Sequence, residues 1–103
     1  MYVLNIFVPE ESKEELKDSL FDAGAGKYKN YDRCSWETKG KGQFRPLENS
    51  NPYIGNKNKI TKVTEYKLEM TFKEKYYENI IQTIERNHPY EEPAYYIFRM
   101  INA

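Results

Sequence analysis

Residues 60–72, with the sequence ITKVTEYKLEMTF, decide the fold class because they form the longest strand pattern in the chain. Apolar side chains occupy every second position in its second half, which is typical of one buried sheet face. Directly after it, residues 73–87 place apolar side chains at i, i+3, i+4 and i+7, the spacing of an amphipathic helix. The alternating strand residues are Tyr66, Leu68, Met70 and Phe72 against Thr61, Val63, Glu65 and Lys67, and the helical ones are Tyr77, Ile80, Ile81 and Ile84.

The N-terminal part of the chain shows the same order of strand and helix. Tyr2–Val8 is apolar on both faces, which predicts a strand in the interior of a sheet. Pro9 ends that strand. Residues 10–23 then predict a helix with acidic residues in its first turn, and Ser12 and Glu15 at the spacing of a capping box.

The middle and the end of the chain supply the remaining strands. Residues 31–38 alternate as a half-exposed strand, and the sequence Lys-Gly-Lys-Gly at 39–42 predicts a turn into residues 43–45, so that the three segments form a hairpin. Residues 47–59 lack periodicity and predict one long loop. Residues 94–101 are apolar at nearly every position, which predicts a strand covered on both faces.

This order predicts one α+β domain over residues 1–103. If the hairpin counts as an extended second strand, the fold is a ferredoxin-like βαββαβ sandwich with an antiparallel sheet backed by two helices. The other sheet face then carries apolar side chains without cover, and such surface favours assembly into a homo-oligomer. The candidate interface residues are Trp36, Phe44, Tyr66 and Tyr96.

Composition narrows the classes of partner. Sixteen basic and sixteen acidic residues cancel and form no long run of one sign, which argues against nucleic acid and anionic membranes as partners. The single cysteine excludes an internal disulfide, and neither a secretion signal nor a membrane-spanning apolar run is evident. We therefore expect a cytoplasmic protein whose partners are proteins, small molecules or ions.

The segment HPYEEPAYY, residues 88–96, gathers the only histidine and two carboxylates between two prolines that stiffen the loop. His88, Glu91 and Glu92 are candidate ligands of a divalent zinc or copper ion. The alternative is structural: His88 and Tyr90 end the preceding helix and shape the turn, with Pro89, Pro93 and Tyr95 completing the loop. We prefer the structural interpretation because no second histidine or paired cysteine is present, and we expect no resident cofactor.

No catalytic set emerges from the remaining residues. Cys34 and His88 are conceivable as a nucleophile and its base. However, Cys34 alternates with Trp36 on an apolar face, which favours a buried thiol. The cationic residues around Gly40 and Gly42 are more typical of a solvated hairpin tip than of an anion site.

Several blocks of sequence are distinctive when taken together: Phe7–Glu11, Ala23–Gly26, Asn30–Asp32, Cys34–Ser35, Gly42–Leu47, Asn51–Pro52, Ile54–Gly55 and His88–Tyr95. In their order and spacing they resemble the domain that is inserted in the middle of the Nif-three-like dinuclear-metal proteins. That domain is similar in fold to the nitrogen regulatory PII proteins and to the divalent-cation tolerance protein CutA, so the resemblance implies a PII/CutA-like fold and a trimer. The dinuclear metal site of the family would lie outside the matched region.

The resemblance therefore implies no cyclohydrolase or other hydrolase activity for these residues. The family commonly has aspartate where this chain has Tyr96, so an acidic role does not carry over to that position. We expect a non-enzymatic, oligomeric binding or regulatory module whose ligand the sequence does not identify. The alternatives are a metal-binding protein acting through residues 88–93, and a subunit of a split dinuclear-metal hydrolase-like protein.

Overall fold

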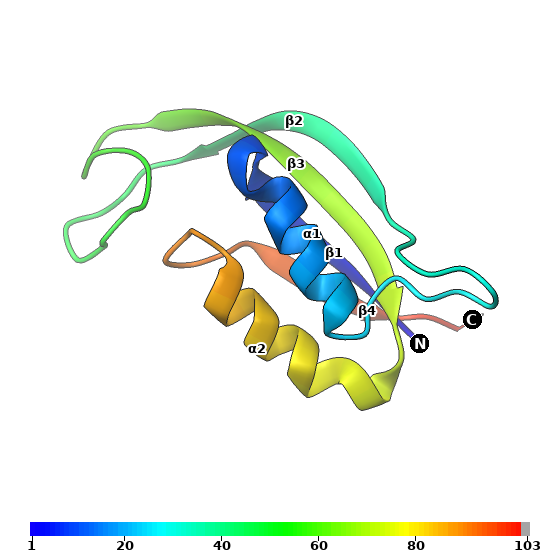
Figure 1. Ribbon diagram of the computed structural model, residues 1–103. Coiled ribbons are helices and arrows are strands. Elements are labelled where there is room, and N and C mark those ends of the chain that lie inside the picture. Colours follow the sequence, from blue (N-terminus) through cyan, green and yellow to red (C-terminus); the bar gives the residue numbers. More distant parts are fainter. Residues whose placement is uncertain (102–103) are drawn as a thin grey trace.

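A computed structural model describes residues 1–101 and shows a two-layer α+β domain (Figure 1). Four antiparallel strands form one sheet in the order β2-β3-β1-β4, and two helices cover one of its faces. No helix within this described part is long and apolar enough to cross a membrane. The elements are β1 (Tyr2–Pro9), a 3-10 turn (Glu10–Ser12), α1 (Lys13–Asp22), β2 (Trp36–Phe44), β3 (Thr61–Phe72), a second 3-10 turn (Glu74–Tyr76), α2 (Tyr77–Asn87) and β4 (Tyr95–Arg99).

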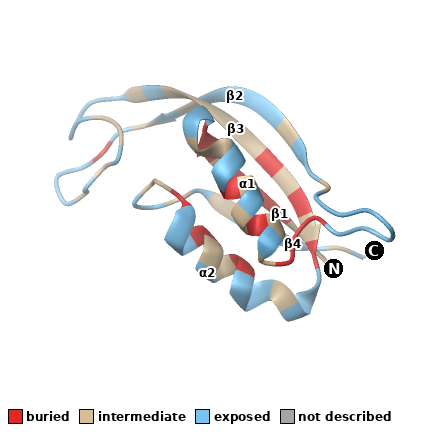
Figure 2. Cartoon of the chain, viewed as in Figure 1, coloured by how far each residue is buried: buried red, intermediate tan, exposed pale blue. Residues whose placement is uncertain are grey.

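The core lies between the helices and the sheet, as the buried residues in Figure 2 show. Strand register explains which side chains face the helices. Leu4 pairs with Met70 and with Ile97, so alternate residues of three neighbouring strands point to the same side of the sheet. The helices contribute apolar residues at i and i+4 that pack onto this side. The buried apolar residues are Leu4, Ile6, Val8, Leu16, Leu20, Ala25, Leu68, Met70, Phe72, Ile80 and Ile84.

The fold class, the central place of β1 and the long strand β3 are confirmed. The helices begin later than predicted, because each opens with a 3-10 turn before the α-helix. The capping box is wrong, since Ser12 makes no side-chain hydrogen bond to the helix N-terminus. The acidic residues at the start of the predicted helix, Glu10 and Glu11, lie in the 3-10 turn, and Glu14 and Glu15 occupy the first turn of α1.

The predicted hairpin within residues 31–45 is wrong. Instead, β2 runs continuously from Trp36 to Phe44 and pairs with β3 along its whole length, with Gly40 opposite Glu65 and Gly42 opposite Val63. In this continuous pairing, alternate residues of β2 exchange backbone hydrogen bonds with β3. A turn at residues 39–42 would break these bonds and leave the matching N–H and C=O groups of β3 without their strand partner. The strand also begins later than predicted, because Arg33 has a φ of 53°, incompatible with a continuous strand.

The sheet face opposite the helices, called the open face below, carries exposed aromatic side chains. The exposure of Trp36, 67%, agrees with the expected uncovered face, whereas β4 was expected to be covered on both sides and its Phe98 is 57% exposed. Cys34 is half-buried rather than buried, and it precedes β2 instead of lying within a strand. Apolar character alone does not distinguish a covered strand face from one left open.

The two described ends of the chain lie next to each other. Tyr2 at the start of β1 pairs with Arg99 at the end of β4, and the backbone N–H of Met100 donates to the carbonyl oxygen of Met1 at 2.9 Å. Figure 1 shows the two ends emerging on the same side of the domain.

Candidate functional site

Two loops meet at one end of the open face. The first, called the proline loop here, comprises residues 88–94 between α2 and β4; the second, the long loop, comprises residues 45–60 between β2 and β3. The backbone N–H of Asn51 donates to Glu91 Oε1 at 2.9 Å, and the rings of Tyr53 and Tyr90 lie 6.3 Å apart. These contacts join segments that are about forty positions apart in sequence.

His88 anchors the proline loop to the sheet and is only 7% exposed. Its Nε2 lies 2.6 Å from the carbonyl oxygen of Phe7, and its Nδ1 accepts a hydrogen bond from the backbone N–H of Tyr90 at 3.1 Å. A carbonyl oxygen only accepts, so Nε2 carries the proton and the ring is in its neutral form. Burial lowers the pKa of His88, opposed in part by the Phe7 carbonyl and by Glu65.

Tyr90 lies against the open face and is fixed there by a carboxylate. Its hydroxyl donates to Glu65 Oε2 at 2.7 Å, and its ring faces Phe44 at a centroid distance of 6.2 Å. Burial raises the pKa of the Tyr90 hydroxyl, and the hydrogen bond to Glu65 raises it further. The Glu65 side chain occupies the space that a Cβ atom at Gly42 would need, so the glycine gives the carboxylate room beside β2.

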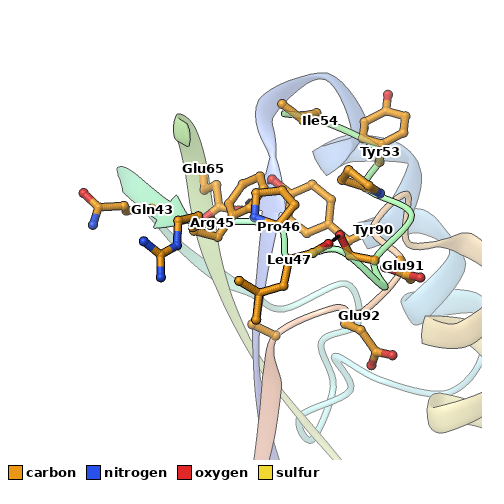
Figure 3. A pocket seen from close by; sticks show the side chains of 14 residues that line it. Gln43, Arg45, Pro46, Leu47, Tyr53, Ile54, Glu65, Tyr90, Glu91 and Glu92 are labelled. Carbon is orange, nitrogen blue, oxygen red and sulfur yellow. Dashed lines mark hydrogen bonds between the residues drawn. The ribbon is translucent and has the colours of Figure 1, made fainter. Parts of the chain in front are cut away.

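A pocket of about 410 Å³ opens between the two loops (Figure 3). Its walls are mainly apolar and aromatic, and carboxylates stand around them, with Tyr90 beneath. A volume and lining of this kind are typical of small-molecule sites. The residues that matter below are Phe44, Pro46, Leu47, Tyr53, Tyr90 and the carboxylates of Glu65, Glu91 and Glu92.

The structure does not gather the predicted metal ligands into a cluster. Both ring nitrogens of His88 already have partners within the chain, and Glu91 Oε1 accepts from Asn51. Among residues 1–101 no group of three or more His, Cys, Asp or Glu side chains is placed to hold a metal ion. Of the predicted loop-shaping residues, three lie within the proline loop: Pro89, Tyr90 and Pro93. The fourth, Tyr95, begins β4, points to the helix side of the sheet and packs against the core.

The four candidate interface residues separate into three places. Trp36 and Tyr96 are exposed on the open face, and the Tyr96 ring lies 6.1 Å from that of Phe7. Phe44 forms part of the pocket wall. Tyr66 lies on the helix side, where Lys13 Nζ sits 4.0 Å from its ring centroid.

The sequence analysis missed Glu65 and Tyr53 as site residues. Glu65 was only one of the polar residues of a long strand, and Tyr53 only a residue of an aperiodic loop. The available signal was Gly42 in β2, since Gly40 has no atom within 4 Å of where its Cβ would stand. Glycine inside a strand often marks the close approach of another group.

The strand order, the antiparallel pairing and the two helices on one face define a PII/CutA-like domain of the ferredoxin-like class. CutA1 from Pyrococcus horikoshii has this fold with a TM-score of 0.72 and 17% identity, covering 100% of this chain and 86% of that one. A Bacillus cereus protein related to NIF3 is more similar, with a TM-score of 0.83 and 31% identity over 98% of this chain and 26% of that one.

The sequence comparison points to the same relatives. The chain is 36% identical over 102 residues to a GTP cyclohydrolase 1 type 2 homolog from Halalkalibacterium halodurans, covering 99% of this chain and 27% of that protein. No protein-family model matches the chain. The predicted resemblance is thus confirmed: this is a PII/CutA-like domain similar to a region of the NIF3-related proteins, and it spans about a quarter of the length of the curated relatives.

Proposed function

We propose that this chain is a non-enzymatic binding or regulatory module that assembles into a homo-oligomer through the open face of its sheet. The observation that carries the proposal is the cluster of aromatic side chains on a face that neither helix covers. Tyr96 links its two neighbours in this cluster, at 6.1 Å from Phe7 and 5.3 Å from Phe98. A second copy of the chain is the simplest cover for such a surface.

The character of this surface supports an interface between copies. Trp36, Tyr96 and Phe98 are 67%, 41% and 57% exposed, and they belong to the two edge strands. Between them, Lys67 and Glu69 of β3 share the same face, so the apolar rings are accompanied by both signs of charge. Aromatic rings are enriched at protein interfaces whereas Lys and Glu are depleted there, so the rings, and not these two charges, favour an interface. The likeness to PII and CutA proteins makes a trimer the preferred state.

Light scattering on the purified protein tests the assembly. We expect the mass of a trimer for the wild type and a loss of assembly for Phe98→Lys, which places a charge in the aromatic cluster. Tyr31→Lys is the matched control, because Tyr31 is 71% exposed but lies outside the sheet. A monomeric wild type would overturn the proposal, whereas a dimer would keep assembly and reject the trimer.

The names of the relatives raise the question of cyclohydrolase activity. Those names apply to proteins about four times longer than the matched region. The nucleophile and base considered above have other partners: Cys34 Sγ lies 3.7 Å from the carbonyl oxygen of Asp32, and His88 Nε2 lies 2.6 Å from that of Phe7. We therefore expect no turnover of GTP or phosphoesters with manganese or zinc. Metal-dependent turnover that survives repurification and disappears in His88→Ala would contradict this.

The role proposed for His88 is to hold the proline loop, with no resident metal ion. Its neutral ring bridges the Phe7 carbonyl oxygen and the Tyr90 backbone N–H, so a metal ion would have to replace one of these bonds. A relative from Archaeoglobus fulgidus is named as a periplasmic divalent cation tolerance protein, which keeps metal binding as the alternative to test. The thermal-shift comparison in the Discussion separates the two.

A further inference from the structure

We propose that the pocket between the long loop and the proline loop binds a small organic cation, namely a primary amine carried on an apolar or aromatic body. The inference rests on the proposed function as a binding module, and it names the class of ligand. It does not depend on the oligomeric state, because the pocket is formed within one chain.

The pocket is held in shape before any ligand arrives. The bond from Tyr90 to Glu65 fixes the ring beneath it, and the bond from the Asn51 backbone to Glu91 holds the long loop against the proline loop. His88 in turn fixes the backbone of Tyr90 to β1. A site whose walls are already ordered loses less conformational entropy on binding, which favours affinity for small ligands.

The walls suit an apolar body with a positive charge. The Phe44 and Tyr53 rings both neighbour the Tyr90 ring, at 6.2 and 6.3 Å between centroids. Pro46 and Leu47 add aliphatic surface. Aromatic faces attract cations through the quadrupole of the ring, and they also bury apolar groups. The volume of about 410 Å³ admits a ligand with a single aromatic ring and a short arm.

The carboxylates in the pocket lining favour a ligand of positive charge. Glu65, Glu91 and Glu92 all line the pocket, and none of them forms an ion pair with a lysine or arginine among residues 1–101. Arg45 is the one lysine or arginine in the lining, and Figure 3 shows its guanidinium group pointing away from Tyr53 and Glu91. Figure 3 shows the Glu92 carboxylate pointing away from Tyr53 and Tyr90 as well, so Glu92 lies at the rim, while Glu65 and Glu91 lie at the apolar wall. The negative potential of these carboxylates favours an amine and disfavours an organic anion.

Backbone amide NMR spectra with 2-phenylethylamine as the probe test this directly. We expect saturable shifts confined to residues 43–54, to Glu65 and its neighbours in β3, and to residues 90–94, at probe concentrations up to about 10 mM. The anion 3-phenylpropionate has a similar body with the opposite charge, and we expect no saturable shifts from it. Equal binding of the two probes, shifts outside these residues, or no saturation would each overturn the proposal.

Three variants locate the determinants. Tyr53→Ala removes an exposed ring and Glu92→Gln removes an exposed charge, and we expect each to weaken binding of the amine by about three- to tenfold. Glu85→Gln is the control, because this exposed carboxylate on α2 lies outside the pocket lining. Unchanged binding in both pocket variants would overturn the proposal.

The outcome separates this inference from the proposed function. Light scattering on the same samples reports assembly independently of the probe. Intact assembly without amine binding rejects the pocket alone. Amine binding by a monomeric protein keeps the pocket and rejects assembly.

Discussion

The two ends of the open face differ in how their side chains are satisfied. At one end, Tyr90 and Glu65 cover the sheet, and the hydrogen bonds of His88 hold them in place. At the other end, Trp36 and Phe98 stand exposed, and residues 1–101 form no second layer over them. At the covered end, the contacts of these side chains stabilise the folded chain. At the open end, the exposed rings are available to contact another molecule. Substitutions at the two ends should affect different quantities.

The largest expected effect is that of His88→Ala at the covered end. The change removes the partners of the Phe7 carbonyl oxygen and the Tyr90 backbone N–H, and we expect the free energy of unfolding to fall by about 1 to 3 kcal/mol. Chemical denaturation with and without a chelator measures it. The loss should be the same in both conditions.

Added zinc or copper tests the alternative role of His88, which is metal binding. A metal ion bound by His88 would raise the melting temperature of the wild type and leave that of His88→Ala unchanged. We expect no such difference between the two proteins at micromolar metal. A thermal shift seen only in the wild type would show that the structural role proposed for His88 is incomplete.

Tyr90→Phe should have a smaller effect at the same end. The ring and its contacts with Phe44 and Tyr53 remain, while the hydrogen bond to Glu65 is lost, so we expect a destabilisation of about 1 kcal/mol. Tyr31→Phe is the matched control, since the Tyr31 side chain is 71% exposed, and it should change little. Equal effects of the two variants on the denaturation midpoint would mean that the bond to Glu65 contributes nothing to stability.

The covered end should also make stability depend on pH. Burial lowers the pKa of His88 in the folded protein below its value of about 6.5 in the unfolded chain, so the unfolded chain binds more protons between these values. Stability therefore falls as the pH drops from about 7 towards 5.5, and it is recovered as the pH rises. His88 is the only histidine, and His88→Gln should flatten this dependence. A wild-type stability that rises on acidification through this range would contradict the assignment.

The smallest effect on stability belongs to the open end. We expect Trp36→Ala to change the free energy of unfolding by less than about 0.5 kcal/mol, because its side chain is 67% exposed. The measurement must be made at a protein concentration where light scattering gives the mass of the monomer. A larger loss under that condition would mean that Trp36 supports the monomer itself.

Sequence patterns predicted the layers of this fold well, because burial against the helices enforces a strict period. Leu4, Ile6 and Val8 in β1 and the even-numbered residues from Tyr66 to Phe72 in β3 follow that period and lie on the helix side. At the glycines at 40 and 42, local propensity favours a turn, whereas pairing with β3 keeps β2 continuous. Long-range pairing decided the outcome, and no local pattern reports it.

The candidate site was only partly predictable for the same reason. The composition of residues 88–93 drew attention to this segment, in which His88 is buried and hydrogen-bonded while Glu91 and Glu92 are exposed. Tyr53, Glu65 and Phe44 come from a loop and two strands far away in sequence. Their meeting depends on the twist of the sheet and on how the long loop folds back. Neither is encoded in a short window of residues.

The adjacent ends of the chain bear on how such a domain combines with others. Because Met1 and Met100 are joined by a backbone hydrogen bond, polypeptide attached before residue 1 and after residue 101 would leave the domain at neighbouring points. To a host protein, the domain would then resemble a short surface loop, whose closure costs little conformational entropy. A fold of this kind can be placed inside another protein without pulling the host's flanking segments apart.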